Sequence, residues 1–233
     1  MAGELKVSRQ DSPKRWDKFT HKNKKLYECR QRIMGYFKKV ASLTPWYDEK
    51  IFNRFQDQLS QIYHELLPGA VVLDVGSGPG ALSGEFCEHY GAQYYVGADY
   101  SAGMARDAKA DFPGQAFVCA DVGSLPFADN SFDIVHSAYL LHHLKPRDRA
   151  RAIKEKMRVA RRAVVIVDCF GFASGFWRVP YWAYYTLVDG SYHRYAIPEW
   201  QSMFEQVQGK IARYCFTDER TILHRIICWV IVP

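Results

Sequence analysis

Three aspartates and three glycines have the residue types and spacing from which a ligand site could be built. Each aspartate stands at the end of a short apolar run, and the glycines directly follow the first run: Asp74, Asp99 and Asp121, with Gly76, Gly78 and Gly80. Glycine has no Cβ and tolerates positive φ, so such a turn brings bare backbone close to a ligand. Carboxylates accept hydrogen bonds from paired hydroxyls or an amino group. The set predicts a nucleotide-type ligand, although any single aspartate could simply cap a helix or form a turn.

Two neighbouring histidines, His142 and His143, are the candidates for proton transfer, because imidazole titrates near neutral pH. Neighbouring residues on a helix or turn diverge, so we expect only one of them to face a ligand. The alternative is that both are structural residues at a helix entry. The six cysteines are scattered and form no Cys-x-x-Cys pair, so we expect neither a metal site nor a disulfide framework.

Alternating strands and helices would position these residues. The sequence predicts a strand from Val71, further strands over 93–99, 115–121, 132–137, 163–168, 210–216 and 224–232, and helices between them. The predicted fold is α/β, with a seven-stranded mostly parallel sheet, an antiparallel last strand and helices on both faces. Ligands of such sheets bind at the carboxyl ends of the strands, where Asp99, Asp121 and the residues after Ser137 would meet the glycine turn.

The chain is expected to divide into two parts. Residues 1–64 are a basic N-terminal segment with cap helices, and 65–233 are the ligand-binding domain. The net charge of +6 fits either a solvated basic face or an RNA-binding one. Tyr47, just before the first core helix, is suited either to cover a ligand or to pack in the core. The first ten residues lack the apolar stretch of a secretory signal, so we expect a cytoplasmic protein without a membrane anchor.

An aromatic stretch, expected to act as a lid over 170–195, would roof the site. Its candidate residues are Tyr181, Trp182, Tyr184, Tyr185 and Tyr192. Tyr139, which lies outside the stretch, is a further candidate for the same roof. Aromatic faces attract a cation, although an ordinary hydrophobic lid would have the same composition. A turn near the end of this stretch, 189–194, carries His193 and Arg194. It either grips a substrate carboxylate through Arg194 or serves only as a surface connection.

In order and spacing, four motifs resemble the class I S-adenosylmethionine-dependent methyltransferases, and most of all their ubiquinone and menaquinone biosynthetic branch. The motifs are Val71–Gly80, the strand-end Asp99, Ala120–Val135 and Leu140–Leu144. The likeness covers about Glu65 to Val167. It implies a Rossmann-like fold, S-adenosylmethionine as cofactor and methyl transfer to a small metabolite. The sequence departs from the family at Val159–Ala163, where the usual Pro-Gly-Gly turn is missing, which leaves the geometry of that turn open.

The resemblance also implies roles for particular residues. The glycines would meet the methionine part of the cofactor with Asp74 organising their loop, Asp99 would bind both ribose hydroxyls, and Asp121 would bind the adenine amino group. The other implied cofactor residues are Tyr47, Ser77, Tyr100, Met104, Val122 and Ser137. The implied catalytic residues are His142, His143, Tyr139 and Tyr192. The implied substrate-binding residues are Tyr181, Trp182, Tyr185, His193 and Arg194.

Two other functions stay open at the level of sequence. In one, an internal nucleophile attacks the aminocarboxypropyl arm of the same cofactor and methylthioadenosine is released. In the other, the chain modifies RNA or binds the cofactor without catalysis. A small-molecule partner is expected in preference to nucleic acid, because no recognised nucleic-acid module accompanies the basic segment. The sequence does not predict an oligomeric state.

Overall fold

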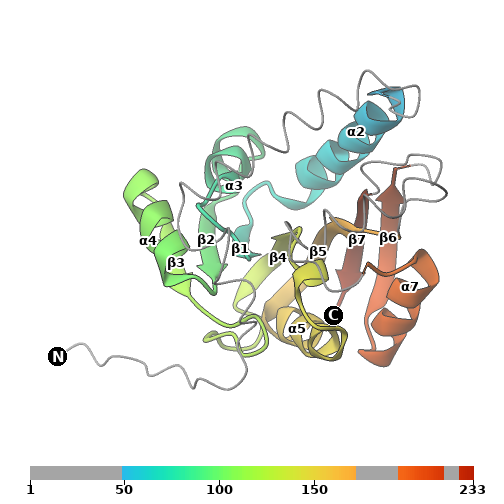
Figure 1. The fold of residues 1–233 in the computed structure, drawn as a ribbon. Coiled ribbons are helices and arrows are strands. Elements are labelled where there is room, and N and C mark those ends of the chain that lie inside the picture. Colours follow the sequence, from blue (N-terminus) through green and yellow to red (C-terminus); the bar gives the residue numbers. More distant parts are fainter. Residues whose placement is uncertain (1–48, 172–193, 218–225) are drawn as a thin grey trace, which may run out of the picture.

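A seven-stranded sheet forms the centre of the computed structural model, which describes residues 49–171, 194–217 and 226–233 (Figure 1). The strand order is β3-β2-β1-β4-β5-β7-β6. The strands are β1 (Val71–Val75), β2 (Tyr94–Asp99), β3 (Ala116–Cys119), β4 (Phe132–Ala138), β5 (Ala160–Cys169), β6 (Lys210–Phe216) and β7 (Ile226–Val232). All run parallel except β7, which is antiparallel to both of its neighbours. The predicted sheet with an antiparallel last strand is therefore confirmed.

Helices cover both faces of this sheet, as predicted. One core cluster packs α5 (Pro146–Val159) and α7 (Ile197–Gln206) against the sheet, and a second packs α2 (Glu49–Leu66) and η1 (Glu85–His89) against its other face. Among the described residues, the other helical elements are α3 (Leu82–Gly84), α4 (Ala102–Asp111) and the 3-10 turn η2 (Leu141–His143). No helix among the described residues combines the length and the apolar character needed to cross a membrane.

Strand β5 shows why the sequence pattern works. Its residues are buried from Ala163 to Asp168, and alternate side chains enter the two core clusters, with Ile166 on the α5 side and Val165 on the α2 side. Apolar β-branched residues suit a strand that is covered on both faces. The predicted start at Ala163 was three residues late, because Ala160 already pairs with Phe132. Helix α5 therefore passes directly into β5, and no separate turn occupies Val159–Ala163.

The helix expected between β1 and β2 differs in detail from a regular α-helix. It consists of the short α3 followed by one wide π-helical turn, and it ends at Gly91 with a φ of 71°. Its apolar residues Phe86 and Tyr90 are buried. Helix α4 begins with an N-cap, because the Ser101 hydroxyl accepts a hydrogen bond from the Met104 amide at 3.3 Å.

Candidate active site

The glycine turn connects β1 to α3 at the carboxyl end of the sheet. Its Gly76 has a φ of 80°, and the Gly76 amide donates to the Ala98 carbonyl at 2.7 Å. Gly97, under the turn in the neighbouring β2, is also required. A Cβ added there would lie 2.5 Å from the Phe117 ring and 2.7 Å from the Ser77 hydroxyl. Glycines at these two positions therefore let the turn lie directly against the sheet edge.

Asp99 joins the turn to the start of α4. Its side chain is only 3% exposed; Oδ2 accepts from the Gly78 amide at 2.9 Å and Oδ1 from the Ser101 amide at 2.8 Å. Burial raises the pKa of this carboxyl from 3.8 to about 6, although the two amides act in the opposite direction. Each oxygen keeps a lone pair, so the ionised group can accept from two adjacent hydroxyls while it holds the turn. This arrangement fits the ribose of a nucleoside cofactor.

Asp74 does not organise the glycine turn by hydrogen bonds, contrary to expectation. Its carboxylate accepts from the Tyr95 hydroxyl at 2.7 Å and lies 2.8 Å from Nδ1 of His136. The other ring nitrogen of His136 lies 2.9 Å from the hydroxyl of Tyr63 on α2. On β1, Asp74 points to the α2 face of the sheet, away from the ligand edge. This buried network of hydrogen bonds fixes α2 to the three neighbouring strands β4, β1 and β2. It thereby supports β1, the strand from which the glycine turn leaves.

Asp121 lies two residues beyond β3, at the start of a loop that reaches β4. The Asp121 carboxylate accepts from the Gly123 amide at 2.8 Å and is 3.7 Å from the Arg151 guanidinium. Its side chain is 41% exposed, so it remains accessible at the sheet edge. The neighbouring Val122 is half-buried, while Met104 is buried on α4. The loop therefore presents two of the candidate adenine contacts, Asp121 and Val122, and α4 presents the third, Met104.

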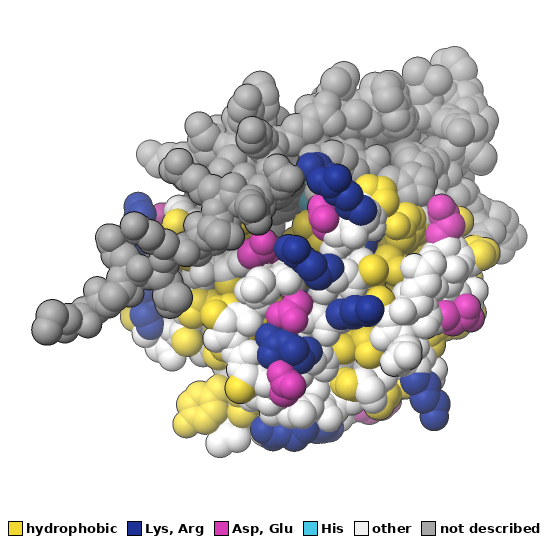
Figure 2. Space-filling view, turned by 90° about the horizontal axis from the view of Figure 1, so that it is seen from below, with side chains coloured by type: hydrophobic (Ala, Val, Ile, Leu, Met, Phe, Trp, Pro, Cys, Tyr) yellow, Lys and Arg dark blue, Asp and Glu magenta, His cyan; other side chains and the backbone are white. Residues whose placement is uncertain are grey.

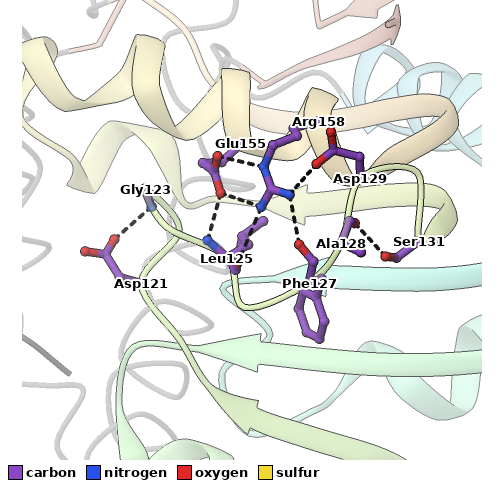
Figure 3. Close-up of polar contacts among 9 residues, drawn as sticks. All are labelled: Asp121, Gly123, Leu125, Phe127, Ala128, Asp129, Ser131, Glu155 and Arg158. Atoms are coloured by element: carbon purple, nitrogen blue, oxygen red, sulfur yellow. Dashed lines mark hydrogen bonds and ion pairs between the residues drawn. The ribbon is translucent and has the colours of Figure 1, made fainter. Parts of the chain in front are cut away.

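One guanidinium on α5 holds this loop in shape (Figure 3). Arg158 donates to the carbonyls of Phe127 and Leu125 at 2.8 and 3.1 Å, and to the carboxylate of Asp129 at 2.7 Å. It also makes a two-point contact with Glu155, 2.9 Å at each oxygen, which holds the pKa of Glu155 below its usual range. Glu155 in turn accepts from the Leu125 amide at 2.9 Å. We call Arg158 and Glu155 the loop clasp.

We expect Arg158→Met to weaken cofactor binding about tenfold without a direct contact to the ligand, because the loop from Asp121 loses its anchors. Calorimetry with S-adenosylmethionine and hydrogen exchange at the Leu125 amide measure the two effects. The exposed Arg147, 3.8 Å from Asp148, provides the control variant Arg147→Met, which should change neither. Faster hydrogen exchange at the Leu125 amide with an unchanged affinity for the cofactor would show that the loop clasp shapes the loop but does not contribute to cofactor binding.

The histidine pair lies in η2, directly after β4. Both side chains are buried, and His142 Nδ1 lies 2.5 Å from Oδ1 of Asp168 at the end of β5. The other Asp168 oxygen accepts from the Leu141 amide at 2.8 Å. Burial alone would raise the pKa of Asp168, but the charge and hydrogen bond of His142, the Cys169 amide and a nearby arginine together hold it below its usual value. An ionised Asp168 therefore fixes the orientation of the His142 ring.

The remaining predicted site residues that are described lie around the ends of β2 and β4 or just before α7. Ser137 is buried, and Tyr139 is 45% exposed, with a φ of 54° and its amide bonded to the Val167 carbonyl at 2.8 Å. Tyr100 is half-buried, and its carbonyl faces the Cys119 thiol. Arg194 is only 2% exposed, so the surface-connection reading is wrong for this residue. The predicted residues outside the described part of the chain are Tyr47, Tyr181, Trp182, Tyr184, Tyr185, Tyr192 and His193.

Three polar residues of this region had no predicted role: Asp168, Lys156 and Arg158. A signal for Asp168 was available, because it follows a buried apolar run and stands one residue before the end of β5. The buried positions of α5 include Arg149, Ala152, Ile153 and Lys156, whose spacing of three and four residues marks one helix face. That spacing places Lys156 in the core, although its charge suggests solvent.

Comparisons with known proteins agree with this geometry. Residues 72–163 match a family model described as a methyltransferase domain. A demethylmenaquinone methyltransferase of Corynebacterium urealyticum is 40% identical over 118 residues, which cover 47% of this chain and 48% of that protein. The chain thus spans about half the length of this curated relative.

Solved structures show the same architecture. A putative methyltransferase from Haloferax volcanii, solved with the Trm112 activator, has a TM-score of 0.61 at 18% identity and covers 80% of this chain and 98% of its own. Magnesium protoporphyrin IX methyltransferase from Synechocystis, with bound S-adenosylmethionine, has a TM-score of 0.55 at 19% identity, over 76% of this chain and 79% of its own. At such identities the likeness concerns the fold.

The sheet order, the glycine turn with Asp99 and the family match define a methyltransferase domain of Rossmann-like fold. Residues 72–163 match the methyltransferase domain, which supports the resemblance of this part of the chain to the class I S-adenosylmethionine-dependent methyltransferase superfamily.

Proposed function

We propose that this chain binds S-adenosylmethionine and transfers its methyl group to a small-molecule acceptor. The observation that carries the cofactor assignment is the buried Asp99 carboxylate, which two backbone amides hold beside the glycine turn. The spare lone pairs of Asp99 suit the two ribose hydroxyls. We expect the loop that starts at Asp121 to contact the adenine, and the turn from Gly76 to Gly80 to contact the methionine part.

S-adenosylmethionine supplies an already activated methyl group when it is bound. The residues of the chain need only hold an acceptor in line with that group and exclude water, which can contribute on the order of 7 to 11 kcal/mol. Where the acceptor loses a proton, we assign its uptake to His142. Because an ionised Asp168 accepts from Nδ1–H, Nε2 is the nitrogen of neutral His142 that can take up a proton.

Mixed surface charge supports a small molecule over RNA as the acceptor. Among the described residues on the face shown in Figure 2, Lys and Arg side chains alternate with Asp and Glu side chains and form no uninterrupted basic patch. Several arginines of α5 and β5 are paired with acids, among them Arg158 with Asp129 and Arg161 with Asp133. An RNA-binding face would leave such cations to the phosphates. The names of the similar demethylmenaquinone and magnesium protoporphyrin IX enzymes also describe small acceptors.

Incubation with methyl-labelled S-adenosylmethionine and a metabolite extract tests the proposal. We expect a labelled small molecule and S-adenosylhomocysteine in equal amounts. Methylthioadenosine formed without any acceptor would instead indicate attack on the aminocarboxypropyl arm. Wild-type protein that does not bind the cofactor in calorimetry would overturn the proposal altogether.

A further inference from the structure

A buried lysine lies one hydrogen bond from the carboxyl end of β4. Lys156 on α5 has no exposed surface, and its Nζ donates a hydrogen bond to the Ser137 hydroxyl at 2.6 Å. Ser137 is buried as well. Burying an amine is unfavourable unless it is paired or neutral. The function proposed above assigns no role to Lys156.

Charged groups from several elements act on this amine electrostatically. Asp168 of β5 and Asp74 of β1 attract its positive form, and the Ser137 hydroxyl of β4 is its hydrogen-bond partner among the described residues. Arg149, on the same face of α5, donates to the Leu144 and His142 carbonyls; His142 also contacts Asp168. Burial lowers the pKa of Lys156 from 10.5 to about 7, and the two carboxylates offset only part of that. The amine therefore changes charge near neutral pH.

The end of β4 that Lys156 contacts lies beside the glycine turn. Asp74 pairs with His136 in register, so Ser137 stands level with the last residue of β1. Just beyond, Leu140 packs against Gly76, where an added Cβ would lie 3.0 Å from its side chain. If the turn holds the methionine part of the cofactor, the sulfonium lies close to this junction.

We propose that Lys156 makes the chain distinguish S-adenosylmethionine, which carries a positive sulfonium, from S-adenosylhomocysteine, which does not. This inference rests on the proposed function. A protonated Lys156 repels a cation at the end of β4, whereas a neutral amine does not. Lys156 therefore releases a proton to solvent when the cationic cofactor binds and retains it when the neutral product binds. The two ligands are otherwise alike, so their affinity ratio isolates this charge.

Calorimetric affinities of both ligands at about pH 6 and about pH 8.5 test the inference, on either side of the titration of Lys156. In the wild type, the affinity for S-adenosylmethionine relative to S-adenosylhomocysteine should rise about tenfold with pH, because one repulsive charge disappears. In Lys156→Met, the same affinity ratio should change by less than about twofold between the two pH values, once the change caused by titration of the ligands themselves is subtracted. Asp99 and the ligands titrate alike in the wild type and in Lys156→Met, so their contribution to the pH dependence cancels when the two proteins are compared. Lys154→Met, on the exposed face of α5, is the matched control and should behave as wild type.

A second measurement needs no variant. In two buffers of different ionisation enthalpy near pH 7, the binding heat of S-adenosylmethionine should reveal proton release by the wild type, and that of S-adenosylhomocysteine should reveal less. Equal pH responses of wild type and Lys156→Met, or equal proton release with both ligands, would overturn the inference and leave the proposed function standing. Failure of both ligands to bind the wild type would overturn the two together.

Discussion

Asp99→Asn should reduce the affinity for S-adenosylmethionine by at least about 100-fold, because it removes the charged acceptor for two hydroxyls. The same substitution should stabilise the ligand-free protein only slightly, because asparagine removes a buried charge but turns its NH2 group toward one of the two amides from which Asp99 accepts. The pKa of Asp99 in the folded protein, about 6, is above its usual 3.8, so the stability that the protonated group contributes is lost as the pH rises from about 4 to about 6. Above that range the buried charge costs up to about 3 kcal/mol, which asparagine avoids, but the unpaired amide costs about 1 to 3 kcal/mol in return.

Calorimetry for affinity and urea unfolding at pH 8 measure the opposite effects of Asp99→Asn. Asp57→Asn, at an exposed position of α2, is the control and should change neither. The wild-type affinity should also fall as the pH drops below about 6, because the diol requires the ionised carboxylate. Near-normal affinity in Asp99→Asn would refute the ribose assignment.

Asp168→Asn should destabilise the protein by about 3 to 5 kcal/mol, because it removes one member of a buried charged group and leaves His142, Arg149 and Lys156 without their anion. For a chain of 233 residues this lowers the unfolding temperature by about 10 °C. The pKa of Asp168 lies below its usual 3.8, so its contribution is present above that pH and is lost as the pH falls through the folded value.

Thermal unfolding of wild type and Asp168→Asn measures this difference. This difference in unfolding temperature should narrow as the pH falls below about 4, where the wild-type carboxyl becomes protonated. The exposed Asp148 near Arg147 supplies the control Asp148→Asn, which should shift stability by less than about 1 kcal/mol. A loss of stability of less than about 1 kcal/mol in Asp168→Asn would mean that Asp168 is not needed to stabilise the buried cations.

The fold could be predicted because its signals are local. Runs such as Val164–Val167 are apolar over the length of a strand, and glycine or proline marks the ends of several elements. Asp99 could be placed at the ligand edge for the same reason, since the end of a parallel strand fixes where its last residue lies. Boundaries were less certain, as the direct passage from α5 into β5 shows.

The polar partners could not be predicted, because they depend on contacts between distant segments. The role of Asp74 is set by Tyr95 and His136, which reach it from β2 and β4. Lys156 sits in a helix whose charges suggest solvent, and only the positions of Ser137 and Asp168 make its burial tolerable. Residue type identifies what these groups can do, but the tertiary fold decides which of them meet.

The hydrogen bonds of the glycine turn also have a consequence for the thermodynamics of binding. Gly76 and Ser77 are bonded to the Ala98 carbonyl, and Gly78 is bonded to Asp99, so the turn is held by the protein itself. Binding then orders few additional backbone bonds, and little conformational entropy is lost in the turn. Most of the conformational entropy of this turn is therefore lost when β1, β2 and α4 fold, and not when the cofactor binds. Cofactor association at the turn needs no slow rearrangement of the backbone.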